Sequence, residues 1–336
     1  MPKVSIIIIN WNGLEDTIEC LESLNKITYQ NYEVIIVDNG SKGNDADILE
    51  ERYKNYIKLI KNKDNLGFTE GNNIGIRKAL EDPACKYILF LNNDTTIRPD
   101  SLSKIVEIAE RGEYKHFGSF QSKIISYYNH KLIDSAGIDY SKNSLSFNRG
   151  SLELVENYSL DKEIFGCCFA AALCRRAAIE DLLKNDGTFF DKDFFIYAED
   201  LDVDFRLQWR GWRSLYVADS IVYHKGSQST KDEKALPIYY SRKNEISVMA
   251  KNIPISFLIK YSPFILITRA MVIGVNFIKR GKVGLVVIKA TIKGILSWHS
   301  MRKKGNTYRK DRSQWDRMNK LFVWKWIVKK NYANKS

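Results

Sequence analysis

The sequence predicts an α/β protein whose mainly parallel sheet is flanked by helices and followed by a basic, helical C-terminal region. First, short apolar runs alternate with amphipathic stretches over the first hundred residues. Second, the apolar runs are continuous and rich in β-branched residues, which is typical of strands buried on both faces. Third, the net positive charge is concentrated towards the C-terminus. Strands that alternate with helices form parallel sheets through right-handed crossovers.

The alternating half contains four predicted strands, each followed by a predicted helix. The helices are recognised by apolar residues three and four positions apart, as at Leu14, Ile18, Leu21 and Leu24. The strands are expected at 4–9, 33–37, 57–60 and 87–91, and the helices at 14–24, 46–53, 70–80 and 101–111.

The middle of the chain, 112–245, is expected to be mixed. Residues 164–173 are small and apolar, so they form either a close-packed strand or a floor that lets a substrate approach. Helices are expected at 175–183 and 199–209, and the acids that open the second suit the positive end of its dipole. Gly211 is expected to end that helix. Short strands are predicted at 214–217 and 221–223.

Polar residues come directly after three of the predicted strands. Asn10 follows the first strand, Asp38 and Asn39 follow the second, and residues 92–94 follow the fourth. In an open parallel sheet these strand ends share one edge, where ligands bind. Asp94, at the abrupt end of an apolar run, is suited to hold Mg²⁺ or Mn²⁺ against a diphosphate. The alternative is that Asp94 caps the next helix or turn.

A glycine-rich stretch at 65–75 leads into the third predicted helix. Gly67, Gly71 and Gly75 recur every four residues, so one helix face can pack closely on backbone or on a ligand. The N-terminus of such a helix favours an anion.

A second cluster of acids lies at 199–204. Carboxylates this dense repel one another, so at least one is expected to have a raised pKa, as a general base requires. The alternative is an ordinary helix start in which Asp202 and Arg206 form a surface ion pair. His224 follows a predicted strand and is either structural or a metal ligand that complements Asp94.

Residues 246–310 contain 13 Lys and Arg but no Asp or Glu, and the rest of the chain has a net charge of −1. The longest uncharged run in this basic, apolar region, 270–278, is nine residues, short of the ~20 that span a bilayer. Lys279, Lys282, Lys289 and Lys293 are expected on one helix face. That pattern favours a helix lying on an anionic membrane surface.

Two other functional classes fit the sequence less well. A dinucleotide-binding enzyme would carry GxGxxG after the first strand, where this chain has Asn-Trp-Asn-Gly at 10–13. No nucleic-acid partner is expected, because the C-terminal cations alternate with aliphatic blocks rather than with aromatic residues. We expect no signal peptide, and the five cysteines without a CxxC pair indicate a reducing cytosol.

Taken together, these motifs resemble those of family-2 glycosyltransferases with the GT-A fold, especially rhamnosyltransferase-like members. The similarity extends over about 1–245, in the order found in that family. The matching segments are 4–13, 34–41, 65–75, 91–94, 199–206 and 224–227.

The resemblance implies a nucleotide-sugar donor, an acceptor hydroxyl, a divalent metal (Mg²⁺ or Mn²⁺) and inversion at the anomeric carbon. It assigns Asp200 as the general base with Glu199 as its neighbour, and Asp94 and His224 as metal ligands. Asn92 stands where many members have the first Asp of a DxD motif. The donor site would comprise Asn10, Asp38, Asn39, Asn65, Gly67, Asn72, Asn92 and Asn93.

The expected organisation has three parts. Residues 1–112 form the nucleotide-sugar-binding half of the GT-A domain, 113–245 its acceptor-binding and catalytic half, and 246–336 the basic amphipathic region. The resemblance suggests dTDP-L-rhamnose as donor, with UDP-hexoses as the alternative, and a polyprenyl-diphosphate-linked saccharide as acceptor. The expected location is the cytoplasmic face of the cell membrane. The alternative from another class is a membrane-bound nucleotide-binding scaffold without catalysis.

Overall fold

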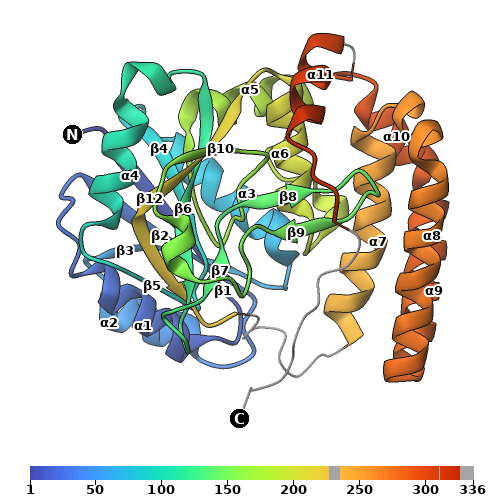
Figure 1. Cartoon of the computed structure of the whole chain (residues 1–336). Helices are drawn as coiled ribbons and strands as arrows, with labels where there is room; N and C mark the ends of the chain where they lie inside the picture. Colours follow the sequence, from blue (N-terminus) through green and yellow to red (C-terminus); the bar gives the residue numbers. More distant parts are fainter. Residues whose placement is uncertain (227–234, 310, 326–336) are drawn as a thin grey trace.

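A ten-stranded mixed sheet forms the centre of the part of the chain that the computed structural model describes, residues 1–226, 235–309 and 311–325 (Figure 1). A separate two-stranded sheet pairs Ile138–Tyr140 with Ser146–Asn148. The strands are β1 (Lys3–Asn10), β2 (Tyr32–Asn39), β3 (Ile57–Asn62), β4 (Cys85–Leu91), β5 (Thr95–Ile97), β6 (Phe117–Ser126), β7 (Ile133–Ser135), β8 (Ile138–Tyr140), β9 (Ser146–Asn148), β10 (Lys162–Ile164), β11 (Ala171–Arg175) and β12 (Arg213–His224).

The strand order is β10-β12-β6-β11-β4-β1-β2-β3, with β5 paired to β12 and β7 to β6. The first four strands are parallel to one another, and so are β6 and β12. β11 runs antiparallel between β4 and β6. The carboxyl ends of β1, β2, β4 and β12 therefore lie at the same edge of the sheet, as the sequence predicts. The mixed, mainly parallel α/β fold is confirmed.

Helices cover both faces of the sheet. The α-helices are α1 (Leu14–Leu24), α2 (Asp45–Tyr53), α3 (Gly67–Leu80), α4 (Ser101–Glu110), α5 (Arg176–Asp186), α6 (Glu199–Trp209), α7 (Ala235–Asn252), α8 (Ile255–Arg280), α9 (Lys282–Leu296), α10 (Trp298–Gly305) and α11 (Arg312–Lys320). Single 3-10 turns occur at η1 (Gly112–Tyr114), η2 (Val155–Tyr158) and η3 (Lys192–Phe194).

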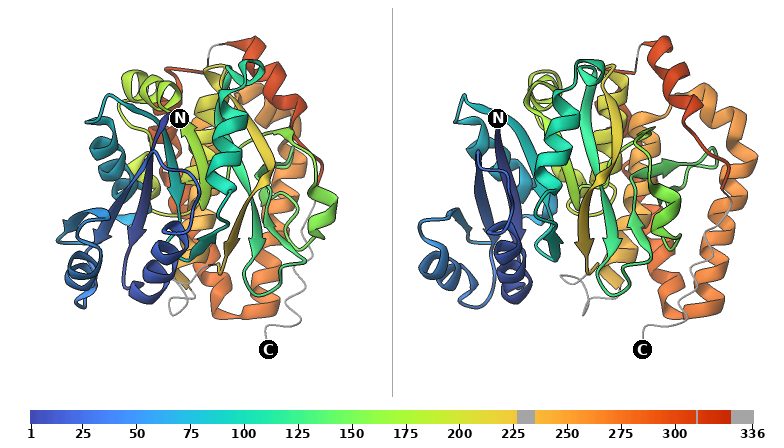
Figure 2. Two further views of the ribbon diagram at one scale, coloured as in Figure 1. Left: turned by 90° about the vertical axis from the view of Figure 1, so that its left-hand side faces the viewer. Right: turned by 60° about the vertical axis from the view of Figure 1, so that its left-hand side comes forward.

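Alternate residues of β1 belong to different cores, which explains its unbroken apolar sequence. Val4, Ile6 and Ile8 join the core that includes Leu21 of α1 and Leu102 of α4. On the other face, Ile7 joins the core that contains residues of α3, α5 and α6. Figure 2 shows the central sheet with the N-terminal strands at one end of the molecule and the C-terminal helices at the other.

A third core attaches the C-terminal helices to the sheet domain. Phe205 and Trp209 of α6 pack with Val248 of α7, Phe257 of α8 and Met318 of α11. α9 packs against α7 and α8, so the basic region is folded onto the domain (Figure 1). α7 runs continuously through the expected division at 245/246.

The structure corrects several expectations in the second half of the chain. The strands expected at 214–217 and 221–223 are one strand, β12, with a register shift between Val217 and Ile221. Within 164–173, only Ile164 and the residues from Ala171 onwards lie in strands. The ion pair between Asp202 and Arg206 exists, but it is buried rather than on the surface.

The C-terminal region differs from expectation in two ways. Gly281, with φ of 49°, separates α8 from α9, so Lys279 does not share a helix with Lys289 and Lys293. The segment Ile255–Ile278 has the length and composition of a membrane-crossing helix, with a mean hydropathy of 1.5. The expectation that this region is too short to span is therefore wrong, because two cations do not interrupt an apolar helix of this length.

Candidate active site

Asp94 and His224 are brought together by the pairing of β5 with β12. His224 lies opposite Thr95 in this antiparallel pair, and the Lys225 N–H donates to the Asp94 carbonyl over 3.0 Å. His224 Nε2 lies 3.2 Å from Asp94 Oδ1. Both side chains are largely buried, and the Asp94 residue is only 4% exposed. The two predicted metal ligands thus meet at the carboxyl edge of the sheet.

A third side chain, which the sequence did not indicate, orients this histidine. Asp134 of β7 places Oδ2 2.8 Å from His224 Nδ1. Burial lowers the pKa of His224, but the carboxylates of Asp94 and Asp134 outweigh that effect and raise it to about 10. Histidine ligands of metals commonly donate their second ring N–H to a carboxylate in this way.

The Asp94–His224 pair fits a divalent cation that displaces the proton of His224, because a metal binds only the neutral ring. His224 Nε2 is buried without a well-oriented hydrogen bond, and it faces a carboxylate. Among the residues that the structure describes, no group of three or more His, Cys, Asp or Glu side chains could hold a metal. Mg²⁺ usually keeps several waters and is bound through one or two carboxylates together with substrate phosphate oxygens, so few protein ligands are needed.

The second acid cluster opens α6. Asp200 is half-buried, and its Oδ1 accepts a 2.7 Å hydrogen bond from the Leu201 N–H. Burial raises the pKa of Asp200 to about 6, although backbone N–H groups oppose the shift. Glu199 is buried with Oε2 unpartnered, and burial and then the charge of Asp200 raise its pKa well above its usual range. At neutral pH we therefore expect this coupled pair to hold one proton, chiefly on Glu199.

The thiol of Cys168 is influenced by the charges of both acidic groups. Burial and then the charge of Asp200 raise the pKa of its thiol, and Asp134 acts in the same direction. Two residues further on, the Ala170 carbonyl accepts a 3.0 Å hydrogen bond from the Asn92 N–H. The segment 168–170 is therefore hydrogen-bonded to the chain that follows β4, two residues before Asp94, and the charges of Asp200 and Asp134 both act on its Cys168.

The ends of β1 and β2 form a buried polar cluster. Asn10 Nδ2 donates to Asp38 Oδ2 over 2.7 Å and to Asp45 Oδ2 over 3.1 Å. Asp38 also accepts hydrogen bonds from the Ser41 backbone N–H and hydroxyl. Asp45, the first residue of α2, was not predicted here.

The remaining predicted donor-site residues contact neighbouring protein groups. Asn39 Nδ2 donates to Asn65 Oδ1 and to the Gly67 carbonyl, both over 3.0 Å. Asn72 donates to the Phe68 carbonyl of its own helix, and Asn93 donates to Thr17 Oγ1. Asn92 is the partly exposed member of the group that follows β4.

The glycine spacing of α3 serves close packing on protein. A Cβ on Gly75 would lie 2.5 Å from Ile7, and one on Gly71 would lie 3.4 Å from Ile9 and Asn39. Gly67 has φ of 78°, and a Cβ there would lie 2.5 Å from Phe195. The sequence left open whether this helix face packs on backbone or on a ligand. The structure shows that it packs on β1 and on the turn before α6.

Comparison with known proteins agrees with this architecture. The profile of Glycosyl transferase family 2 matches residues 5–183, more than half of the chain. The rhamnosyltransferase WbbL of Escherichia coli K12 is 29% identical over 224 residues, which cover 64% of this chain and 80% of WbbL. The chain spans about a third of the length of the first curated relatives that it matches, from 32% to 37%.

Two solved structures share the fold. GalNAc-T7, in complex with UDP, GalNAc and Mn²⁺, superposes with a TM-score of 0.58 at 16% identity, covering 75% of this chain and 48% of that one. The mannosyltransferase PcManGT of Pyrobaculum calidifontis, in complex with GDP-Man and Mn²⁺, gives 0.52 at 14% identity, covering 89% and 87%. The fold, the edge that carries the acids and the matched profile together show that this chain belongs to glycosyl transferase family 2.

Proposed function

We propose that this protein is an inverting, metal-dependent glycosyltransferase that moves a sugar from a nucleotide-sugar to a hydroxyl of a saccharide acceptor. The proposal rests on one observation above all. Asp94 and His224 meet at the carboxyl edge of the sheet, and the charge of Asp200 at the start of α6 acts on Cys168, in a segment that is hydrogen-bonded to Asn92 beside them. Family membership and two neighbours of the same fold bound to nucleotide-sugar or nucleotide support it.

In this proposal Asp94 and His224 hold the cation, and Asp134 fixes the tautomer and orientation of His224. When bound, the cation offsets the negative charge that develops on the departing nucleoside diphosphate. The donor nucleoside lies towards Asp38, Asn10 and the ends of β1 and β2. Asn92, partly exposed beside Asp94, contacts the ribose rather than the metal.

Asp200 acts as the general base. A carboxylate whose pKa is about 6 is ionised at pH 7 and retains a higher proton affinity than an ordinary aspartate. It takes the proton of the acceptor hydroxyl as the oxygen attacks the face of the sugar opposite to the departing diphosphate. Glu199 is protonated beside Asp200, so the site does not carry two adjacent negative charges.

The similarity to WbbL, a rhamnosyltransferase, favours L-rhamnose carried by dTDP as the donor. UDP-hexoses are the alternative donors, and a nucleotide-binding scaffold without catalysis is the alternative from another class. The raised pKa of Asp200 favours catalysis over the scaffold, because a scaffold needs no base.

We further propose that α8 and α9 lie on an anionic membrane at its cytoplasmic face, where they bring the enzyme to a lipid-linked acceptor. Lys289 and Lys293 are exposed on α9, and 246–310 contains no acid. Large apolar side chains are exposed along both helices. They include Ile259, Leu266, Ile267, Met271, Val275, Phe277, Ile278, Leu285, Ile292, Ile295 and Leu296.

The contacts of α8 favour lying on a membrane over crossing it. Arg269 pairs with Glu245 of α7 and donates to the Ser144 carbonyl over 2.6 Å. One residue earlier, the buried Thr268 accepts a hydrogen bond from Asn143 Nδ2 over 3.1 Å. A helix that crossed a bilayer alone would have to leave these partners.

A screen of nucleotide-sugars tests the proposed reaction. Purified protein is incubated with dTDP-rhamnose, UDP-glucose, UDP-galactose, UDP-GlcNAc and GDP-mannose, with Mn²⁺, with Mg²⁺ and with EDTA. We expect one donor to be hydrolysed or transferred, and EDTA to abolish turnover. Nucleotide binding without turnover of any donor, in the presence of lipid-linked acceptors, would favour the scaffold.

A further inference from the structure

The turn that leads into α6 has an unusual backbone. Phe195, Tyr197 and Ala198 have φ values of 64°, 67° and 62°, in the left-handed region that non-glycine residues rarely occupy. This turn directly precedes Glu199 and Asp200. A strained segment of this kind persists only where its surroundings hold it.

One side chain of α7 holds this turn. Asn244 is fully buried, and its Nδ2 donates to the carbonyls of Phe194, Ile196 and Tyr197 over 2.8, 2.9 and 2.7 Å. Its Oδ1 is buried without a hydrogen-bond partner. The NH2 group of Asn244 is thus directed at the turn, although its carbonyl oxygen stays unpaired. A buried oxygen without a partner lowers the stability of the fold.

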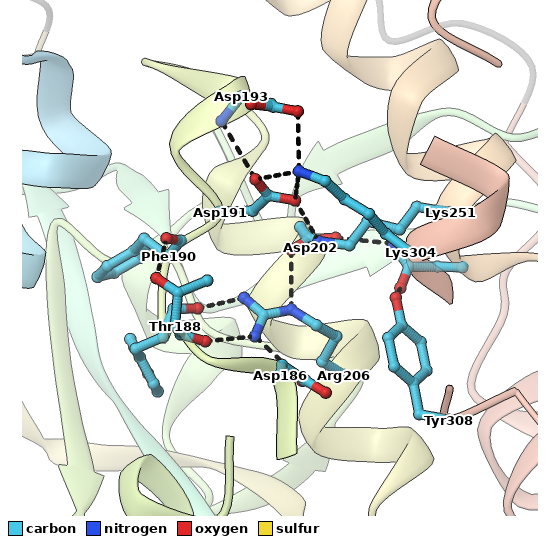
Figure 3. A network of polar contacts seen from close by, with 12 residues as sticks. Asp186, Thr188, Phe190, Asp191, Asp193, Asp202, Arg206, Lys251, Lys304 and Tyr308 are labelled. Atoms are coloured by element: carbon cyan, nitrogen blue, oxygen red, sulfur yellow. Dashed lines mark hydrogen bonds and ion pairs between the residues drawn. The ribbon is translucent and has the colours of Figure 1, made fainter. Parts of the chain in front are cut away.

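The same face of α7 holds the chain after the turn. Lys251, two helical turns beyond Asn244, places Nζ 2.8 Å from Asp191 and 2.8 Å from Asp202. Asn252 Nδ2 donates to the other oxygen of Asp202 over 2.9 Å. Figure 3 shows Lys251 between these two carboxylates, with Lys304 reaching Asp191 and Asp193. α7 therefore contacts the chain both before and after Asp200.

The N-terminus of α3 supports the turn from another side. The Thr69 N–H donates to the Phe195 carbonyl over 3.2 Å, and Gly67 leaves room for the Phe195 ring. Asn244 nevertheless directs the two hydrogens of one amide group at three carbonyls of the turn.

We propose that Asn244 is a positioning residue for catalysis: by fixing the carbonyls of Phe194, Ile196 and Tyr197 it sets the place of the Asp200 carboxylate at the start of α6. The inference rests on the proposed role of Asp200. It makes α7 a part of the catalytic apparatus, although this helix continues into the C-terminal region. Asn244 itself contacts neither the donor nor the acceptor.

The test compares Asn244→Ala with Asn143→Ala in the whole chain. Asn143 is a matched control, because it is also fully buried with Oδ1 unpartnered, while its Nδ2 donates to Thr268 and to the Lys325 carbonyl. For each variant we measure the urea midpoint, the Kd of the nucleoside diphosphate with Mn²⁺, and kcat and KM with the donor identified by the screen.

We expect both variants to lose comparable stability and to bind the nucleotide as the native protein does. Asn244→Ala should lower kcat by about 10²-fold, the effect of a small misplacement of a reacting group, while Asn143→Ala keeps a native kcat. Ala198→Gly, which suits the left-handed backbone, should restore part of the kcat of Asn244→Ala. Equal kcat in both asparagine variants would overturn the inference.

If Asn244→Ala does not fold, Asn244→Ser replaces it, since a hydroxyl has a single hydrogen and the variant therefore loses most of the contacts that hold the turn. A native kcat in this variant would equally overturn the inference. A native protein that is inactive with every donor would instead contradict the proposed function, so the two failures are distinguishable.

Discussion

Asp200 is half-buried at the first turn of α6, where it combines access with a raised pKa. Its replacement by Asn keeps the shape and removes the base. We predict that Asp200→Asn lowers kcat by about 10²–10⁴-fold, the usual contribution of a general base. Calorimetry should show native affinity for the nucleoside diphosphate. Undiminished turnover would remove Asp200 from this role.

The raised pKa of Asp200 also predicts how turnover depends on pH. The base must be ionised, and burial raises its pKa to about 6, so protonation below that pH removes activity. We expect kcat/KM to fall about tenfold per pH unit below pH 6 and to level off above pH 7. A profile that stays flat down to pH 4.5 would contradict this assignment.

Asp134 contacts His224 but lies outside the cation pair itself, so its effect should be on metal affinity. We predict that Asp134→Asn weakens Mn²⁺ binding about 10–100-fold, the range found for partners of metal-ligating histidines. Asp139→Asn is the control, because Asp139 is also partly buried but pairs with Lys325. Titration calorimetry with Mn²⁺ and UDP measures both. Equal Mn²⁺ affinities of the two variants would argue against Asp134 as the hydrogen-bond partner of a metal-binding histidine.

At the residue scale, the sequence predicted side chains that directly follow strands, because the end of an apolar run locates them. Asp94 and His224 are of this kind. Asp134 and Cys168 could not be found, since their proximity depends on a short hairpin strand and on the segment before β11, neither of which has a distinctive pattern. Asn93 and Asn72 were predicted as donor contacts, and both donate hydrogen bonds to neighbouring protein groups. Their contact with a donor stays a prediction.

At the scale of elements, α7 and α6 are joined by buried charges. Burial raises the pKa of Asp202, but Lys251 and then Arg206 outweigh it and hold the pKa below its usual value. We predict that Lys251→Met costs about 3–5 kcal/mol in the free energy of unfolding, because it leaves buried carboxylates short of a partner. Urea denaturation measures it. Lys303→Met, at an exposed lysine of α10, should change stability by about 0.5 kcal/mol or less.

The buried ion pairs of Lys251 with Asp202 and Asp191 also determine how the stability of the fold changes as the pH falls. Lys251 and Lys304 likewise outweigh burial and lower the pKa of Asp191. Since these carboxylates titrate lower in the folded chain than in the unfolded one, their contribution is complete above about pH 4 and is lost as the pH falls further.

The four strands and four helices predicted in the first 111 residues agree with the structure to within a few residues, since each is marked by its own apolar spacing, whereas the short strand β5 was not predicted. The second half was harder to predict. β12 was divided in two because a register shift interrupts its pattern at Val217–Ile221. The prediction that the lysines from 279 onwards share one helix face was wrong, because Gly281 separates α8 from α9. The predicted motif at 224–227 ends at Ser227, which lies outside the described residues. Residues 227–234, 310 and 326–336 are not described.

At the scale of the molecule, the exposed apolar side chains of α8 and α9 predict membrane binding. Leu266 and Leu296 are 68% and 73% exposed. We predict that Leu266→Glu with Leu296→Glu lowers partitioning onto anionic vesicles by about tenfold or more, because burial of a leucine contributes about 1.5–3 kcal/mol. Leu160→Glu, at a leucine 79% exposed elsewhere, should partition as the native protein does. Equal sedimentation of all three would contradict the membrane face.

The central claim is that Asp94 and His224 hold a cation within reach of a base on α6. The most direct measurement is the anomalous diffraction of crystals grown with Mn²⁺ and dTDP or UDP. We predict one Mn²⁺ peak bound by the Asp94 carboxylate and His224 Nε2, with diphosphate oxygens completing its shell and Asp200 facing the same cavity. A Mn²⁺–nucleotide complex bound elsewhere on the chain, or with Asp200 on the far side of a packed layer, would contradict the account.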